Sequence, residues 1–307
     1  MLQYLIIIVD DSSPSFCHYE NSKTKRSLIP INKLKQGIFF AMTENLMIQF
    51  VYPNYELTKE YVDVIESIDH FNISPNKDDA DVWVTSINSD IESEVPVVIR
   101  LGKDDLFANI DVLSDILVKV PRLNIIITDI DRFGSNDFQK YDEALRTLST
   151  SVEGLLLSGK GTMLNLLTDR LVLNQMNNCG AGDSTITLAP NGEYYLCPAF
   201  YYNNEPSLEC ISNRPQLKNQ QLLRLDHSPI CSHCDAYQCK RCVWLNKKTT
   251  CEVNTPSHEQ CVVAHIERNS SKDLLRRIRQ HGNYFPDTDE IVDIDYLDPF
   301  ENKRKWQ

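Results

Sequence analysis

The sequence predicts a two-part α/β protein, with a parallel sheet in residues 1–175 and a small cysteine-rich metal-binding module after it. Three observations support this prediction. Short apolar runs alternate with amphipathic helical patterns up to about residue 175, and this alternation predicts parallel strands with right-handed crossovers, open or curved into part of a barrel. Nine of the ten cysteines then fall between positions 179 and 261. Two CxxC pairs stand within twelve residues there, and each pair can turn two thiols toward one metal.

The expected strands are short apolar runs, and the expected helices place apolar residues on one face. The run at 5–9 is continuous and β-branched, as expected of a strand that is covered on both faces. The other expected strands are 46–52, 82–85, 97–101, 123–128 and 152–157. Helices are expected from a cap at Asn32, over 57–68, over 106–120 and through 138–148. This number of strands fits a partial α/β barrel.

From Asn174 the periodicity fades and turn residues appear, so we place a boundary near residue 175. Segments 185–188 and 193–196 flank a Pro-Asn-Gly turn and predict a β-hairpin. In a module of this size, over 176–265, bound metal can replace a core that is too small to be stable alone. Residues 266–307 are expected to form a basic helix followed by an acidic tail, and the helix to present a solvated face, with docking of an acidic leader peptide as the alternative.

The amino-acid composition and the lengths of the apolar runs argue against several classes of function. The net charge of −12 argues against a nucleic-acid partner, which a basic face would attract. No apolar run approaches the roughly 20 residues that a membrane span needs. The run at 5–9 is short and is followed at once by Asp10, so it predicts a buried strand and not a signal peptide. We therefore expect a cytoplasmic protein whose cysteines are thiols or metal ligands, and not disulfides.

The cysteine pattern resembles that of the SPASM domain, the auxiliary-cluster module of radical SAM peptide maturases. The hairpin sequence Asn191-Gly192-Glu193-Tyr194-Tyr195-Leu196-Cys197 resembles the one that leads into the second cysteine of that domain. The spacing in the central run is slightly shorter here than is usual for the family. The part before it resembles a radical SAM core. The full pattern is Cys179, Gly192-x4-Cys197, Cys231-x2-Cys234-x4-Cys239-x2-Cys242 and Cys261.

The chain departs from radical SAM enzymes where they hold their catalytic cluster on CxxxCxxC after the first strand. Here that position contains Ser13, Cys17 and Glu20. One thiolate cannot hold a cubane cluster that needs three. The motif that contacts SAM after the second strand is also absent, and residues 52–56 stand there. We therefore expect no SAM cluster and no SAM-binding residues. Cys17 is then either a small buried residue or a redox-active thiol.

Taken whole, including Phe16-Cys17-His18-Tyr19-Glu20-Asn21, the chain resembles the CXXX repeat peptide maturase family. The resemblance implies a part in modifying a ribosomally made cysteine-repeat precursor peptide. It also implies work beside a true radical SAM enzyme, in a heterodimer, because this chain lacks the motif for generating the radical.

The same resemblance implies two auxiliary iron–sulfur sites of the 4Fe–4S type, although the number could be one. The first site would use Cys231, Cys234, Cys239 and Cys261. The second would use Cys179, Cys197 and Cys242 with Cys210, leaving Cys251 spare or as an alternative ligand. Zinc is the alternative metal, because four-thiolate zinc sites use the same CxxC pairs. His18, His233 and His258 lie near cysteines and could bind zinc, but each is expected to be a solvated loop residue.

Three functions remain open. The first is a maturase subunit that carries auxiliary clusters or binds the peptide. The second is a stand-alone enzyme that uses thiol or cluster chemistry. The third is an adaptor whose zinc ions only hold a peptide-binding module together. Spectra of anaerobically purified protein would separate the third from the other two.

Overall fold

The computed structural model describes residues 2–23, 25–172, 179–212, 214–236, 239 and 242–291. A nine-stranded sheet with the strand order β7-β6-β5-β4-β3-β2-β1-β8-β9 organises them. Neighbouring strands are parallel except β8 and β9, which form an antiparallel hairpin. The strands are β1 (Tyr4–Ile8), β2 (Met47–Val51), β3 (Phe71–Ser74), β4 (Val82–Thr85), β5 (Val97–Leu101), β6 (Arg122–Ile127), β7 (Met163–Leu164), β8 (Thr185–Leu188) and β9 (Tyr194–Tyr195).

Helices cover the outside of this sheet. They are α1 (Ile31–Thr43), α2 (Lys59–Ile65), α3 (Lys103–Ala108), α4 (Ile110–Lys119), α5 (Ser135–Leu157), α6 (Asp169–Val172), α7 (Pro198–Tyr202), α8 (Val243–Thr250) and α9 (His258–Arg279). A small second sheet pairs β10 (Cys210–Ile211) with β11 (Arg214–Pro215). Within the described part of the chain, no helix has the length and apolar character that crossing a bilayer requires.

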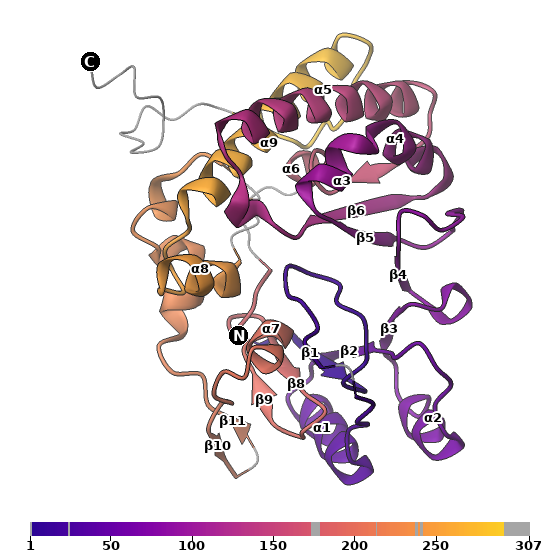
Figure 1. The fold of residues 1–307 in the computed structure, drawn as a ribbon, viewed down its shortest axis with the longest axis vertical. Helices are drawn as coiled ribbons and strands as arrows, with labels where there is room; N and C mark the ends of the chain where they lie inside the picture. The colour runs from indigo at the N-terminus through magenta and orange to yellow at the C-terminus, as the bar shows by residue number, and fades with distance from the viewer. Residues whose placement is uncertain are drawn as a thin grey trace.

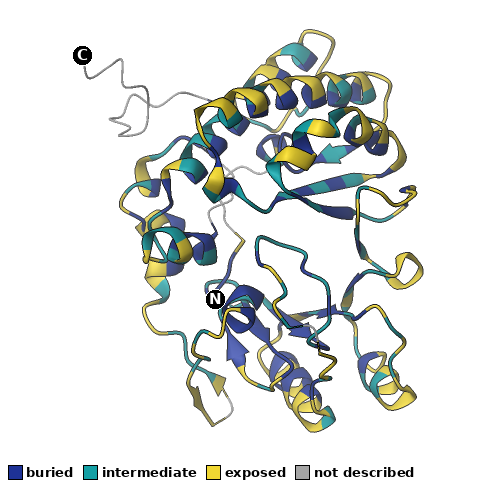
Figure 2. Ribbon diagram, viewed as in Figure 1, coloured by how far each residue is buried: buried dark blue, intermediate teal, exposed yellow. Residues whose placement is uncertain are grey.

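The sheet is strongly curved. In Figure 1, β1 to β3 lie in the lower part of the molecule, β5 and β6 lie in the upper part, and β4 joins the two on one side. Apolar side chains of five adjacent strands form one buried layer: Ile6, Val51, Ile73, Val84 and Val98. Alternate residues of β1 point the other way, toward α1, so both faces of this strand are covered, as its continuous apolar run predicts. Figure 2 shows the buried strands between exposed helix surfaces.

Several predicted elements need correction. Residues 152–157 are the last turns of α5 and not a strand, because Val152 and Leu156 continue the helical spacing of Leu145 and Leu148 into the same core. The predicted helix over 106–120 is divided into α3 and α4 at Asn109. Asn32 lies in the first turn of α1, which begins after Pro30, so it does not cap this helix. The short strands β3 and β7 were not predicted.

The hairpin prediction is confirmed, and its strand β8 extends the main sheet by pairing with β1. At the other end, α9 packs on α5, and its residues Leu274, Leu275 and Ile278 join the core between these helices and the strands β5 and β6. The cysteine-rich part therefore shares its sheet and its helix layer with the first part of the chain. The predicted boundary near 175 and most of the acidic tail lie outside the described residues, and the division at 265 falls within α9.

Gly37 provides a test of how closely α1 packs on the sheet. A Cβ at this position would stand 2.3 Å from the Cδ2 atom of the buried Leu188. A Cβ at Gly154 in α5 would meet nothing within 4 Å. Alanine at either helical position gains up to about 1 kcal/mol of helix propensity. Overpacking costs about 1–3 kcal/mol, so in urea unfolding Gly37→Ala should be less stable than Gly154→Ala by that amount. Equal stability of the two variants would contradict the packing.

Candidate metal centres

The loop after β1 crosses the carboxyl ends of the strands and carries Cys17. Arg100 of β5 holds it, with Nε donating to the carbonyl oxygen of Cys17 at 2.8 Å and Nη2 to that of Tyr19 at 2.6 Å. His18 Nδ1 donates to the carbonyl oxygen of Ile127, at the end of β6, at 3.0 Å. His18 therefore has a structural contact and is not a free loop residue. These bonds fix the loop from Cys17 to Tyr19 at one edge of the sheet.

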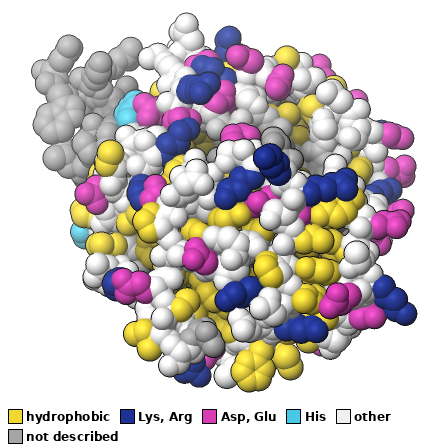
Figure 3. Space-filling model, turned by 60° about the horizontal axis from the view of Figure 1, so that its bottom comes forward, with side chains coloured by type: hydrophobic (Ala, Val, Ile, Leu, Met, Phe, Trp, Pro, Cys, Tyr) yellow, Lys and Arg dark blue, Asp and Glu magenta, His cyan; other side chains and the backbone are white. Residues whose placement is uncertain are grey.

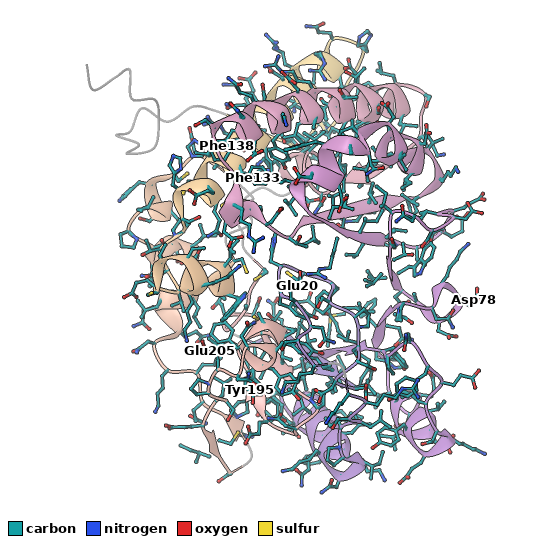
Figure 4. All side chains as sticks on the ribbon, in the orientation of Figure 1. Glu20, Asp78, Phe133, Phe138, Tyr195 and Glu205 are labelled. Carbon is teal, nitrogen blue, oxygen red and sulfur yellow. The ribbon has the colours of Figure 1, made fainter. Side chains whose placement is uncertain are left out.

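The other two positions of the missing cluster motif are used structurally. Ser13 is fully buried, and its hydroxyl donates to the carbonyl oxygen of Val51 at 2.9 Å. Glu20 forms an ion pair with Arg100 at 2.7 Å. Figure 4 shows Glu20 between the lower and upper parts of the molecule. Both side chains thus position the loop, and only Cys17 offers a soft metal ligand there.

Three further cysteines approach Cys17. Cys197 is the N-cap of α7, and Cys242 is the N-cap of α8, where its sulfur accepts a hydrogen bond from Leu245 N at 3.4 Å. Cys179 lies next to the tight turn that leads into β8. We call Cys17, Cys179, Cys197 and Cys242 the edge thiols.

The pKa values of Cys197 and Cys242 show that the edge thiols influence one another. Burial raises the pKa of Cys197, and the neighbouring Cys179 and then Cys17 raise it further. Burial also raises the pKa of Cys242 well above its usual range, followed by the effects of Cys17, Cys179 and Cys197. Without a cation the thiols of Cys197 and Cys242 are therefore protonated at neutral pH. A bound metal would replace those protons, which fits a site made of thiolate ligands.

A second group consists of Cys231, Cys234 and Cys239, which we call the inner thiols. Cys231 is buried, and the others are half-buried. Burial raises the pKa of Cys239 to about 12, and the nearby Cys231 adds to this effect more than Cys234 does. The amide of Ala236 donates to Cys234 Sγ at 3.3 Å, which supports a thiolate at this position.

His265 is a candidate ligand that the sequence analysis missed. Its Nε2 lies 3.4 Å from Cys234 Sγ, and both atoms lie within 4.8 Å of an Asp235 carboxylate oxygen. Among the described residues, Cys234, Asp235 and His265 form the group of three possible metal ligands whose atoms all lie within 4.8 Å of one another. Asp235 is buried and paired with Arg268, so its charge is already balanced. The signal that could have found His265 is its place four residues after Cys261, on one face of α9.

The remaining cysteines lie in three different places. Cys261 is half-buried in the first turn of α9, one turn before His265, on the side of the inner thiols. Its membership of the first predicted site stays a prediction. Cys251 is exposed at the end of α8 in a left-handed conformation. Cys210 is exposed on β10, and burial followed by Glu193 raises its pKa, whereas Lys33 lowers it. The structure thus places Cys210 beside α1, away from the three thiols it was predicted to join.

A buried ion pair lies beside the inner thiols. Arg170 and Glu267 are 1% and 2% exposed and stand 3.2 Å apart. The hydroxyl of Tyr141 donates to the other carboxylate oxygen of Glu267 at 2.7 Å. Both charges influence the pKa of Cys239, which shows that the pair is near that sulfur. This network joins α5, α6 and α9 behind the inner thiols.

A pocket of about 620 Å³ lies between α1 and the region around β9 and β10. Phe39, Tyr194 and Leu208 give it apolar walls, and Lys33 and Arg214 lie at its rim. Figure 3 shows this underside, where hydrophobic side chains lie among lysines and arginines. The pocket suits a segment of mixed apolar and acidic character.

The basic helix predicted after Cys261 is α9, and its arginines are largely used within the protein. Arg268 is buried against Asp235, and Arg277 pairs with Glu153 at 2.7 Å. Arg279 donates to backbone oxygens of Phe285 and Thr288. The expected solvated face is therefore wrong for these residues. They are also committed to contacts that an acidic peptide would have to displace.

Comparison with known proteins gives the following result. No family model matches the chain, and no curated protein matches it. Solved structures similar to it include SuiB of Streptococcus suis bound to the precursor peptide SuiA, with 10% identity and a TM-score of 0.38 over 68% of this chain and 62% of that chain. SuiB bound to S-adenosylmethionine gives 10% identity and a TM-score of 0.36 over 68% of this chain and 63% of that chain. The chain thus spans less than two thirds of these structures, and likeness of this degree assigns no activity.

Proposed function

We propose that this chain is a metal-binding subunit of a peptide-maturation system of the CXXX repeat kind, working beside a radical SAM enzyme. The observation that carries the proposal is the grouping of its thiols. The loop that would hold a SAM cluster retains one cysteine, Cys17, while six other cysteines belong to the two groups of edge and inner thiols. Such a chain can hold auxiliary clusters without offering SAM a free iron.

Iron–sulfur clusters, when bound in these groups, would supply electron transfer. The chain's own residues would do three things. The edge and inner thiols would bind the irons, and hydrogen bonds from backbone amides to Cys234 and Cys242 would stabilise their thiolates. The buried pair of Arg170 and Glu267 would keep water from the inner thiols. The loop around Cys17 would remain fixed to β5 and β6.

Peptide binding is assigned in this proposal to the pocket beside α1. On the side of β9 away from β8, the carbonyl oxygen of Tyr194 already accepts a hydrogen bond from Leu208 N at 2.7 Å, so a peptide would bind here through the side chains of the pocket. Phe39 is 71% exposed there and offers an apolar contact. Cys210 stands at the same pocket, where a thiol could meet a cysteine of the precursor.

Complementation tests this role. A candidate precursor peptide is incubated with SAM, reductant and a candidate radical SAM partner, with and without this protein. We expect the modified peptide only when both proteins are present, and no 5′-deoxyadenosine from this chain alone, because it lacks the three thiolates that a SAM cluster needs. Equal modification without this protein would contradict the proposal. Mass spectrometry of the peptide gives the readout.

A zinc-stabilised adaptor is the second candidate, and one observation favours it. A separation of 3.4 Å between Cys234 Sγ and His265 Nε2 suits two ligands of one tetrahedral zinc ion, which places sulfur and nitrogen ligands about 3.6 Å apart. Thiolates around an iron–sulfur cube stand farther apart. Metal analysis, together with absorption and EPR spectra of anaerobically purified protein, distinguishes the two candidates. Zinc without iron favours the adaptor.

A further inference from the structure

We propose that Cys17 is the fourth ligand of a metal centre that it shares with Cys179, Cys197 and Cys242. The position of the loop, and not the spacing of the cysteines, carries this inference. The centre would be of the four-thiolate class that binds a 4Fe–4S cluster, because among the described residues no three of these sulfurs lie within 4.8 Å of one another, as the ligands of one zinc ion would. The inference does not depend on a role in peptide maturation, because metal content can be measured without SAM, peptide or partner.

The loop is docked firmly enough to present a ligand. On one side, Arg100 and Ile127 bind its backbone and the ring of His18, as described above. On the other side, the ring of Tyr19 stacks on that of Tyr202 in α7, with centroids 5.3 Å apart and planes at 9°. Cys17 therefore lies between the strand ends and the helix that Cys197 caps.

The same contacts join the helices that carry the other ligands. Phe200 of α7 and Trp244 of α8 make an edge contact, with their ring centroids 5.5 Å apart. Phe200 belongs to the buried cluster that includes Tyr19 and Val243, and Trp244 packs against this cluster. Cys17 and Cys197 pack against it too. Cys242 directly precedes Val243. Cys17 and Cys197 thus pack against one apolar cluster contributed by the loop, α7 and α8, and Cys242 lies in the adjoining core cluster, which Trp244 also contacts.

The remaining ligand in this proposal is Cys179, which comes just before the turn into β8. The amides of Asp183, Ser184 and Thr185 all donate to the carbonyl oxygen of Gly180, so this turn is closed next to Cys179. Gly180 has a positive φ of 71°, which permits the turn. The exposed thiol of Cys179 can then close the site from outside.

The charges of the site call for a cation. Four thiolates brought together around one site would repel one another. The nearby cation, Arg100, directs its donors to carbonyl oxygens and to Glu20. A metal would offset this repulsion and hold all four residues in their thiolate form.

Cys210, the alternative fourth ligand, is a matched control. It is exposed on β10, and the charged groups that affect its pKa are Glu193 and Lys33, not the edge thiols. Cys17→Ser and Cys210→Ser are each purified anaerobically and reconstituted with iron and sulfide, and in parallel with zinc. We expect Cys17→Ser to lose the metal of one centre in at least one of the two series. Cys210→Ser should retain the wild-type content in both.

Loss of metal from Cys210→Ser but not from Cys17→Ser would overturn the proposal. Because Cys17→Ser could fail to fold, the wild-type protein is also treated with iodoacetamide before and after removal of metal by a chelator. Alkylation needs a free thiolate, so metal should protect Cys17, as quantified by mass spectrometry. Equal modification of Cys17 in both forms would overturn the proposal as well.

Discussion

Replacing Cys234 by alanine is expected to release the metal of the inner thiols and to unfold the segment around them. Cys234 Sγ accepts a hydrogen bond from Ala236 N and lies 3.4 Å from His265 Nε2, so replacing Cys234 removes both contacts from the site. In small modules, structural metal contributes about 10–16 kcal/mol of apparent binding free energy, which is as large as the whole free energy of unfolding of an ordinary domain, about 5–15 kcal/mol. Metal-to-protein ratio and resistance of residues 225–236 to proteolysis measure the two effects.

Cys251→Ala is the matched control for this variant. Cys251 lies in the same part of the chain but is exposed at the end of α8, so its removal should leave metal content unchanged. His265→Ala distinguishes the two kinds of centre. It should release zinc that is bound through His265 and leave a centre of four thiolates intact. Full metal content in Cys234→Ala would show that the inner thiols hold no metal.

Glu267→Ala is expected to lower the free energy of unfolding by about 3–5 kcal/mol, because it leaves the guanidinium of Arg170 buried without its partner. Arg170 is 1% exposed, and the nearest remaining acceptors are backbone oxygens, of Ala264 at 3.3 Å and Leu166 at 3.5 Å. The hydroxyl of Tyr141 also loses the carboxylate that accepts its hydrogen bond. Urea unfolding followed by circular dichroism gives the difference.

Asp142→Ala is the control for this ion pair. It removes an exposed pair with Arg146 in α5, where the side chains are 36% and 75% exposed. Pairs of this kind contribute about 0.3–0.5 kcal/mol, so the control should be nearly neutral. If the two variants had the same free energy of unfolding, the buried network would not contribute to the stability of the fold. Proximity to Cys239 adds a second readout, because loosening of the network should also weaken metal binding by the inner thiols.

Much of the fold could be predicted because its strands carry a strong local signal. The apolar runs that became β1, β2, β4, β5 and β6 are short and bounded by polar or turn residues. The errors came from ambiguous patterns. The run at 152–157 is short and leucine-rich, so it resembles a buried strand, but only the tertiary core shows that it continues α5. The strand β7 spans two residues, too few for any periodic signal.

The site was less predictable, since its ligands come from distant parts of the chain. The CxxC pair of Cys231 and Cys234 is a local signal that spacing reveals. Cys17 and Cys242 are more than two hundred positions apart, and their proximity depends on how a loop crosses the sheet edge. His265 carries no motif of its own, and only the position of α9 brings it to Cys234. Contacts of this range follow from the tertiary fold alone.

The most direct test of the central claim is the production of 5′-deoxyadenosine by this protein alone. The protein is reconstituted with iron and sulfide, reduced, and incubated with SAM, with and without the precursor peptide. We expect no 5′-deoxyadenosine above the level of a protein-free control, because Ser13 and Glu20 leave Cys17 as the only thiolate at the catalytic position. Repeated turnover of SAM by this chain alone would contradict the account.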